Sequence, residues 1–193
     1  MKRIGIFGGS FNPTHKLHKE IAEYLIQQEI VDKIIFVPTG NGYPKKELIP
    51  LKYRIKMLEM EFGKDMHYEI SDFEDQKSCV YTYQTLDHFH SLYPDSKIYF
   101  IMGTDNLNEI DTWQRYPYLL ENYFFIVVKR DGYDSTQMEE KLEQYKSHFL
   151  FVEVPFNQVS STRIRENLRN GESVEKELSK SVLNYIKAEK LYL

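Results

Sequence analysis

One stretch near the start of the chain decides the fold: residues 8–18 read Gly-Gly-Ser-Phe-Asn-Pro-Thr-His-Lys-Leu-His. A mostly apolar run of strand length, residues 3–7, precedes it. After it, Leu17, Ile21 and Leu25 recur at the four-residue spacing that places side chains on one face of a helix. The sequence therefore predicts a buried strand, a glycine turn and an amphipathic helix, which is the opening unit of an α/β sheet.

Residues 8–18 also form a candidate anion site. With Thr14 as the helix N-cap, His15 and His18 are expected in the first turn on the same side. Free backbone N–H groups, the helix dipole and two imidazoles favour a polyphosphate there. A zinc pair would lack a third ligand at a suitable spacing, and structural histidines are common, although the glycine turn disfavours that explanation. Neither GxGxxG nor GxxxxGK[ST] occurs at this turn, which disfavours a dehydrogenase and a P-loop kinase.

The alternation of strands and helices continues to the C-terminus. Further strands are expected at residues 33–37, 67–70, 97–102, 123–128 and 149–154. Helices are expected at residues 15–29, 51–62, 82–92, 115–121, 136–146, 161–169 and 174–188. This order predicts an α/β fold: a Rossmann-like, doubly wound parallel sheet in a single domain, with a helical C-terminal part.

Loops rich in glycine or polar residues follow four of the expected strands. They begin at Gly8, Pro38, Gly103 and Pro155. In a parallel sheet these loops share the carboxyl edge, where open α/β sheets bind ligands. Asp105 could there accept hydrogen bonds from a ribose. Residues 160–165, Ser-Ser-Thr-Arg-Ile-Arg, offer hydroxyl and guanidinium groups to an anion, although an ordinary capped surface helix explains this pattern about equally well.

The composition excludes several classes of function. The 193 residues include 25 Lys and Arg against 29 Asp and Glu, so the formal net charge is −4 and no basic excess indicates nucleic-acid binding. The single cysteine, Cys79, excludes an intramolecular disulfide and a Cys-rich zinc site. No segment approaches the roughly 18 apolar residues of a membrane helix, and residues 4–7 are too short for a secretory signal core. We therefore expect a cytoplasmic protein without nucleic-acid or membrane partners.

Taken together, these motifs resemble the nucleotidyltransferase superfamily with the (H/T)xGH motif, and more closely the bacterial nicotinate-mononucleotide adenylyltransferases. Residues 8–15 and 160–165 match the family's opening loop and terminal signature. Residues 80–86, Val-Tyr-Thr-Tyr-Gln-Thr-Leu, resemble its Ser-Tyr-Thr-x-Asp-Thr-Leu segment. Weaker matches occur in the expected order at Val37-Pro38, Pro44-Lys45-Lys46, Arg54-x-x-Met57-Leu58, Phe100–Asp105, Trp113, Val182-x-x-Tyr185-Ile186 and Leu191-Tyr192. The resemblance covers almost the whole chain and implies one nucleotidyltransferase domain over residues 1–193.

The resemblance implies a reaction in NAD biosynthesis: nicotinate mononucleotide and ATP give deamido-NAD and pyrophosphate. It implies that Mg²⁺ is carried with ATP and that no protein residue binds the metal. By the same resemblance, His15 and His18 are the catalytic pair. The residues it implies for ATP are Gly8, Gly9, Ser10, Phe11, Lys46, Gly103, Asp105, Ser161, Thr162 and Arg165. Those it implies for nicotinate mononucleotide are Tyr81, Thr82 and Trp113.

Two positions depart from the family pattern. Leu17 stands where the family has glycine, and Lys45 where it has histidine. Leu17 either completes the apolar face of the helix or crowds the ATP site, which would put activity in doubt. Three alternatives stay open. Leu17 is the reason for the first, a nucleotide-binding regulator with impaired turnover. The others are another adenylyl or cytidylyl transferase, such as one acting on phosphopantetheine, which the match at residues 81–86 disfavours, and an RNA-binding relative of the tRNA synthetases, which the net charge disfavours. The sequence also leaves a homo-oligomer open.

Overall fold

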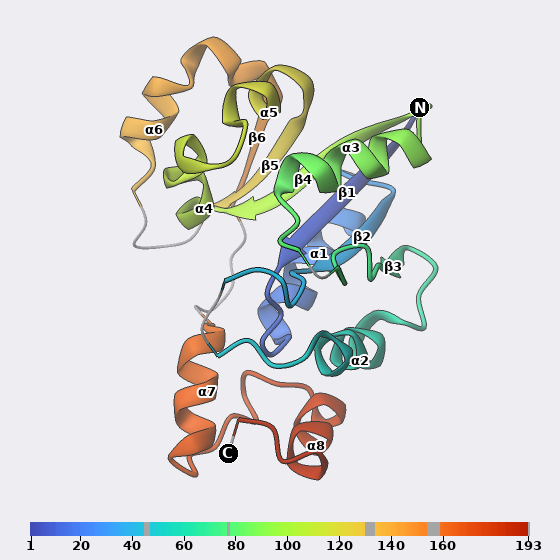
Figure 1. Cartoon of the computed structure of the whole chain (residues 1–193), viewed down its shortest axis with the longest axis vertical. Helices are drawn as coiled ribbons and strands as arrows, with labels where there is room; N and C mark the ends of the chain where they lie inside the picture. The colour runs from blue at the N-terminus through green and yellow to red at the C-terminus, as the bar shows by residue number, and fades with distance from the viewer. Residues whose placement is uncertain (45–46, 77, 130–133, 154–158, 193) are drawn as a thin grey trace.

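A computed structural model of the chain describes residues 1–44, 47–76, 78–129, 134–153 and 159–192. Six strands form one sheet in the order β3-β2-β1-β4-β5-β6, and every neighbouring pair is parallel (Figure 1). The strands are β1 (Lys2–Gly9), β2 (Lys33–Pro38), β3 (Tyr68–Ile70), β4 (Ser96–Gly103), β5 (Phe124–Lys129) and β6 (Phe149–Glu153). The six expected strands and the doubly wound α/β fold are confirmed.

Helices connect and follow the strands. They are α1 (Lys16–Gln27), α2 (Leu51–Phe62), α3 (Thr82–Leu92), α4 (Thr104–Asn108), α5 (Tyr116–Asn122), α6 (Thr136–Lys141), α7 (Ser161–Arg169) and α8 (Lys180–Ala188). Short 3-10 helices cover Ile110–Thr112 and Glu143–His148. The bounds predicted for α2, α3 and α7 are confirmed.

Three helix predictions were too long, and one helix was missed. The helix expected over residues 15–29 covers only Lys16–Gln27. The helix expected over residues 136–146 ends at Lys141 and gives way to the second 3-10 helix. The helix expected from residue 174 begins only at Lys180, because the Ser179 side chain accepts a hydrogen bond from the Val182 N–H and caps it there. The five-residue α4 is too short to produce a hydrophobic period.

Side chains that alternate along the strands build two apolar layers. On one face Leu17, Ile21 and Leu25 of α1 are buried with Leu58 and Phe62 of α2. Their partners on the sheet are Phe7, Ile34, Phe36, Ile101, Ile126, Val128 and Val152. On the opposite face α3, α4 and α5 bury Leu86, Phe89, Leu107, Leu119 and Leu120 against the other set of strand residues. Both faces of the sheet therefore carry helices, as expected for a parallel sheet.

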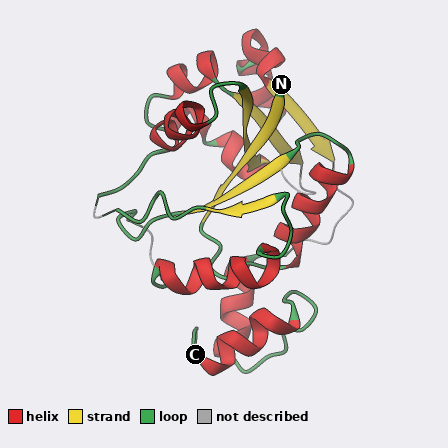
Figure 2. Cartoon of the chain, turned by 90° about the vertical axis from the view of Figure 1, so that its right-hand side faces the viewer, coloured by secondary structure: helices red, strands yellow, loops and turns green. Residues whose placement is uncertain are grey.

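The helical C-terminal part packs on α2. Figure 1 shows α7 and α8 together at one end of the molecule beside α2, and Figure 2 shows the same helices beyond the sheet. Their shared core includes Met57 of α2, Ile164 and Leu168 of α7, and Val182 and Ile186 of α8. This packing brings the last helices of the chain next to the loops that follow β1 and β2.

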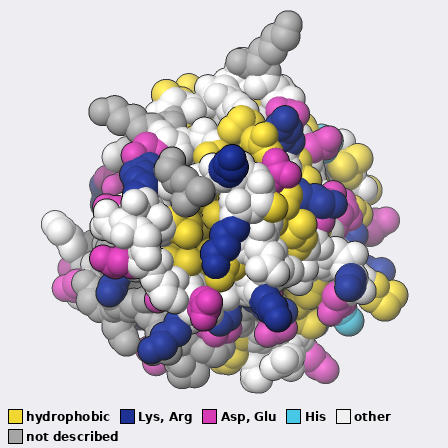
Figure 3. Space-filling view, turned by 90° about the horizontal axis from the view of Figure 1, so that it is seen from below, with side chains coloured by type: hydrophobic (Ala, Val, Ile, Leu, Met, Phe, Trp, Pro, Cys, Tyr) yellow, Lys and Arg dark blue, Asp and Glu magenta, His cyan; other side chains and the backbone are white. Residues whose placement is uncertain are grey.

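The surface at the C-terminal end of the molecule carries charges of both signs. Seen from the end that carries α7 and α8, Lys and Arg side chains are interspersed with Asp and Glu (Figure 3). Among the described residues, no helix is both long and apolar enough to cross a membrane.

Candidate active site

A cavity of about 450 Å³ lies at the carboxyl ends of β1 and β4. The connections from these two adjacent strands run to opposite faces of the sheet, the arrangement at which open α/β sheets bind ligands. Seven of the residues predicted for ATP or nicotinate mononucleotide line it. These seven are Gly8, Gly9, Ser10, Tyr81, Thr82, Asp105 and Trp113. Lining residues that sequence reasoning missed are Thr39, Tyr43, Glu74, Val80, Phe100, Asn106, Glu109, Thr112 and Gln114.

The two glycines that end β1, together with Ser10, form one wall of this cavity. A Cβ atom on Gly8 would lie 2.8 Å from the Phe100 ring, so only glycine fits there without displacing that ring. Ser10 follows, and its carbonyl accepts a hydrogen bond from Arg54. Phe11 has a φ of +45° and turns its ring inward, where it is buried and packs against Phe7 and Phe36. Contact between Phe11 and ATP stays a prediction.

The two motif histidines lie side by side at the start of α1. The helix begins at Lys16 with His15 as its N-cap, so the predicted N-cap at Thr14 is wrong. The His15 backbone N–H donates to Nδ1 of His18 at 3.2 Å, and the two rings stack with centroids 3.7 Å apart. His15 is buried, while His18 is half-buried with its ring against Phe11. The two histidines are thus joined by a hydrogen bond from the backbone of His15 to the ring of His18.

Leu17 lies between the histidines in sequence but not in the site. Its side chain is only 6% exposed and belongs to the apolar layer formed by Ile21, Leu25 and Phe7. The cavity lining does not include it. Of the two explanations for this departure from the family, the structure supports completion of the apolar helix face.

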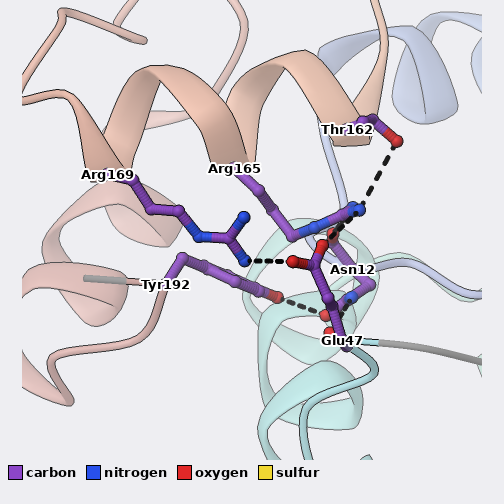
Figure 4. Close-up of polar contacts among 6 residues, drawn as sticks. All are labelled: Asn12, Glu47, Thr162, Arg165, Arg169 and Tyr192. Atoms are coloured by element: carbon purple, nitrogen blue, oxygen red, sulfur yellow. Dashed lines mark hydrogen bonds and ion pairs between the residues drawn. The ribbon is translucent and has the colours of Figure 1, made fainter.

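Helix α7 docks on the loop that carries the histidines. The Ser161 hydroxyl donates to the Pro13 carbonyl at 3.1 Å, and Nη1 of Arg165 donates to the Asn12 carbonyl at 2.9 Å. Nη2 of Arg165 reaches the Thr162 hydroxyl at 3.4 Å (Figure 4). The two motifs at opposite ends of the chain therefore meet. Lys46, also predicted for ATP, lies outside the described residues.

A polar network fixes the loop after β2 to α7 and to the C-terminus. Glu47 pairs with Arg169 at 2.9 Å and with Arg165 at 3.4 Å, and its carbonyl accepts from the Asn12 amide at 2.8 Å (Figure 4). The hydroxyl of Tyr192 donates to Oδ1 of Asn12 at 2.8 Å. The two guanidinium groups, Arg169 foremost, hold the pKa of Glu47 below its ordinary value. No local sequence pattern indicated this network, because its members come from four distant segments.

Arg54 holds the loop after β1 in place through hydrogen bonds. It is fully buried and donates to the carbonyls of Ser10 and Ile49 at 2.9 Å and to the Asn41 side chain at 3.0 Å. Burial lowers its pKa to about 10, so it stays charged at neutral pH. Its side chain joins the loop after β1 to the loop after β2. The Arg54-x-x-Met57 match was the available signal, but no local pattern assigns Arg54 this role.

The carboxyl groups of Glu74 and Asp105 line the cavity. Glu74 accepts hydrogen bonds from the Thr85 hydroxyl at 2.7 Å and from the Gly40 N–H at 3.4 Å, and burial raises its pKa. Oδ1 of Asp105 is buried and has no hydrogen-bond partner among the described residues. An orphaned acceptor is costly unless a ligand supplies a donor. This orphaned oxygen is consistent with an acceptor for a ribose hydroxyl, and that role of Asp105 stays a prediction.

Comparison with known proteins identifies the family. Residues 6–167 match the cytidylyltransferase-like family model. A curated relative from Clostridium tetani, a probable nicotinate-nucleotide adenylyltransferase, is 36% identical over the full length of both chains. The chain belongs to the nicotinate-nucleotide adenylyltransferase family. A second member, from Endomicrobium trichonymphae, is 38% identical and is also covered completely.

Solved structures agree with this family in fold. The nicotinic acid mononucleotide adenylyltransferase of Plasmodium falciparum, complexed with NaAD, superposes with a TM-score of 0.87 at 21% identity. The match covers 100% of this chain and 98% of that one. Its complex with APC superposes with a TM-score of 0.84 at 20% identity. At these identities the likeness establishes the family's fold, and the site residues rest on their own geometry.

Proposed function

We propose that the chain transfers the adenylyl group of ATP to nicotinate mononucleotide, releasing deamido-NAD and pyrophosphate. The observation that carries this proposal is the docking of α7 on the histidine loop, which binds Ser161 and Arg165 to the carbonyls of Pro13 and Asn12, just before the two histidines. Gly8–Ser10 extend from this loop into the cavity that Tyr81 and Trp113 also line. A phosphate-binding group and a pocket for a second nucleotide are thus adjacent, which is what joining two nucleotides requires.

The chemistry needs positioning more than a protein nucleophile. The substrate phosphate is an anion near neutral pH and attacks the α-phosphorus of ATP in line, so the P–O bond to pyrophosphate breaks as the new one forms. Fixed donors that meet the developing charge supply the acceleration. We assign this role to Nε2 of His18, since Nδ1 already accepts from His15 and leaves the ring proton on Nε2.

The departing pyrophosphate requires cationic and hydroxyl donors. Ser161, Thr162 and Arg165 come from the first two turns of α7, whose N-terminal N–H groups also attract anions. Lys46 is retained as a further candidate from the resemblance alone. ATP is proposed to enter as its Mg²⁺ complex, with the metal on the phosphates. In the described part of the chain, no cluster of three His, Cys, Asp or Glu side chains forms a metal cage.

The pyridine ring is assigned to the Tyr81–Trp113 side of the cavity. Trp113 is fixed edge-to-face on Phe100 with centroids 5.7 Å apart, which leaves its orientation set for stacking. The Tyr81 N–H, however, already donates to the Gln84 side chain at 3.0 Å, so it is not available to the nicotinate carboxylate. Thr82, the first residue of α3, is the remaining candidate, because N–H groups of a first helical turn lack intrahelical partners.

The decisive experiment is a substrate panel. The protein is incubated with ATP, Mg²⁺ and nicotinate mononucleotide, nicotinamide mononucleotide or phosphopantetheine, and pyrophosphate release is measured. We expect the highest kcat/KM with nicotinate mononucleotide. Preference for phosphopantetheine would favour another transferase, and ATP binding without release from any substrate would favour a regulator. The buried position of Leu17 removes the main reason for the regulator. Cytoplasmic location and homo-oligomer formation stay predictions.

A further inference from the structure

The carboxylate of Glu47 lies between two arginines of α7. Arg169 binds one of its oxygens at 2.9 Å, and Arg165 approaches the other at 3.4 Å. Figure 4 shows both guanidinium groups directed from the same side of the helix toward Glu47. Residues four apart on a helix share a face, so this convergence follows from the sequence spacing. A side-chain carboxylate is thus bound both to Arg165, which we proposed for the pyrophosphate, and to Arg169.

The present partners of Arg165 do not use all of its hydrogen-bond donors. Its Nε atom is buried and has no hydrogen-bond partner among the described residues. Its contact with Glu47 is long at 3.4 Å, although the side chain is only 12% exposed. A carboxylate offers two oxygens, whereas a terminal phosphate offers three, and arginine binds phosphate through paired N–H groups. A phosphate at this point could therefore satisfy donors that Glu47 does not.

The ion pairs of the Glu47 carboxylate are weak enough for another anion to replace it. Its side chain is 47% exposed, and ion pairs of this exposure contribute little net stability. Its backbone has a φ of +61°, in the left-handed region that non-glycine residues rarely adopt. The Asn12 amide holds its carbonyl independently of the carboxylate. The carboxylate can therefore leave the arginines while the loop stays attached.

We propose that Glu47 is an internal counter-anion which the β- and γ-phosphates of ATP displace, and that Arg169 is a second phosphate-binding arginine beside Arg165. The inference rests on the proposed function, because that function brings a triphosphate to Arg165. It adds two residues to the site. In the ligand-free protein, Glu47 neutralises one of two closely placed cations. With ATP bound, the phosphates take both guanidinium groups.

A direct binding measurement tests this without turnover. Inorganic tripolyphosphate is titrated by calorimetry into the wild type, Glu47→Gln, Arg169→Gln and the control Arg163→Gln. Arg163 is an exposed cation on the same helix and no member of the network, so its variant corrects for loss of one charge. We expect Glu47→Gln to bind several-fold more tightly and Arg169→Gln roughly tenfold more weakly, with Arg163→Gln within about twofold of wild type. Weaker or unchanged binding by Glu47→Gln, or equal losses in the two arginine variants, would overturn the proposal.

A second readout uses the wild-type protein, so it does not depend on a variant that folds. The side-chain carboxyl of Glu47, assigned by comparison with Glu47→Gln, or by selective labelling if that variant is unfolded, is followed by ¹³C NMR during the same titration. We expect its chemical shift to move toward that of a solvated carboxylate as tripolyphosphate binds. An unmoved signal at saturation would show that the pair persists and would refute displacement. The substrate panel separates the two ideas: absent pyrophosphate release refutes adenylyl transfer, whereas these titrations judge the anion exchange alone.

Discussion

Nδ1 of His18 accepts a hydrogen bond from the backbone N–H of His15 at 3.2 Å. Because an amide N–H can only donate, this Nδ1 is unprotonated and the neutral ring carries its proton on Nε2. The stacked ring of His15, with its centroid 3.7 Å away, and the ring of Phe11 limit how the imidazole can turn. The first histidine of the motif thus prepares the second as a donor with a defined tautomer and orientation.

The first prediction separates the two nitrogens of His18. His18→Asn places an amide oxygen near the Nδ1 position and preserves the contact with the His15 N–H, but it removes the Nε2 donor. We expect kcat to fall by about 100-fold to 1,000-fold with little change in the KM for ATP, since the donor acts on developing charge. His18→Gln, whose amide reaches further, should retain more activity. Normal kcat in folded His18→Asn would show that His18 is structural.

The second prediction concerns preference for the acid substrate. With the Tyr81 N–H engaged by Gln84, the donors left for the nicotinate carboxylate are those of Thr82. We expect nicotinate mononucleotide to exceed nicotinamide mononucleotide in kcat/KM, because a charge-assisted hydrogen bond is roughly twice as strong as a neutral one. Thr82→Val, which removes the hydroxyl, should lower the ratio of kcat/KM for nicotinate mononucleotide to kcat/KM for nicotinamide mononucleotide. Equal efficiencies in the wild type would reject a carboxylate pocket.

The third prediction tests whether the hydrogen bonds of Arg54 stabilise the loops after β1 and β2. Arg54→Met has similar length but leaves the Ser10 and Ile49 carbonyls and the Asn41 side chain without their donor. Each buried acceptor left unpaired costs about 1–3 kcal/mol, so we expect a loss of about 3 kcal/mol or more in the free energy of unfolding. Urea denaturation measures this loss. Arg54→Lys keeps the charge but has a single donor nitrogen, so its stability should lie between those of the wild type and Arg54→Met. A loss in Arg54→Met no larger than that of an average surface substitution would contradict the assignment.

The fourth prediction follows from the buried carboxyl of Glu74. Burial raises its pKa above the ordinary value of 4.5, so the folded state binds this proton more tightly than the unfolded state. The group therefore favours folding at acidic pH, and this contribution is lost as the pH rises from 4.5 through the raised pKa. Glu74→Gln stays neutral throughout. In urea denaturation between pH 4 and 8, the stability of the variant relative to wild type should rise across this window and then level off; a flat difference would contradict it.

The sequence predicted the parts of the molecule that local patterns determine. Apolar runs indicated all six strands, and the motifs at residues 8–15 and 160–165 indicated the loops that meet at the histidines. It failed at two helix starts and where tertiary contacts decide. The Ser179 cap sets the start of α8, and the contact between the His15 N–H and the His18 ring sets the N-cap of α1; both contacts are local, but several residues near each helix start could have capped it. Arg54 binds Ser10, 44 residues away, and Glu47 pairs with Arg165, 118 residues away, and no spacing in a single sequence encodes such pairs.

The last prediction concerns Leu17, where the chain departs from its family. The side chain is 6% exposed and packs in the layer of Ile21 and Leu25, so its removal leaves a cavity. Leu17→Ala should lower the free energy of unfolding by about 2–5 kcal/mol, and Leu17→Gly by roughly 1 kcal/mol more because glycine disfavours the helix. Leu17→Met, which nearly conserves volume, is the control and should change stability by less than about 1.5 kcal/mol.

The same variants test whether the Leu17 side chain affects ATP binding or turnover. Since the leucine lies in the core and not in the cavity lining, the KM for ATP of folded Leu17→Ala should stay within about twofold of wild type. Assays well below the melting temperature keep the less stable variants folded, and circular dichroism verifies this. A large gain in ATP affinity or turnover in Leu17→Ala or Leu17→Gly would show that the side chain obstructs the triphosphate. It would then favour a nucleotide-binding regulator in place of an enzyme.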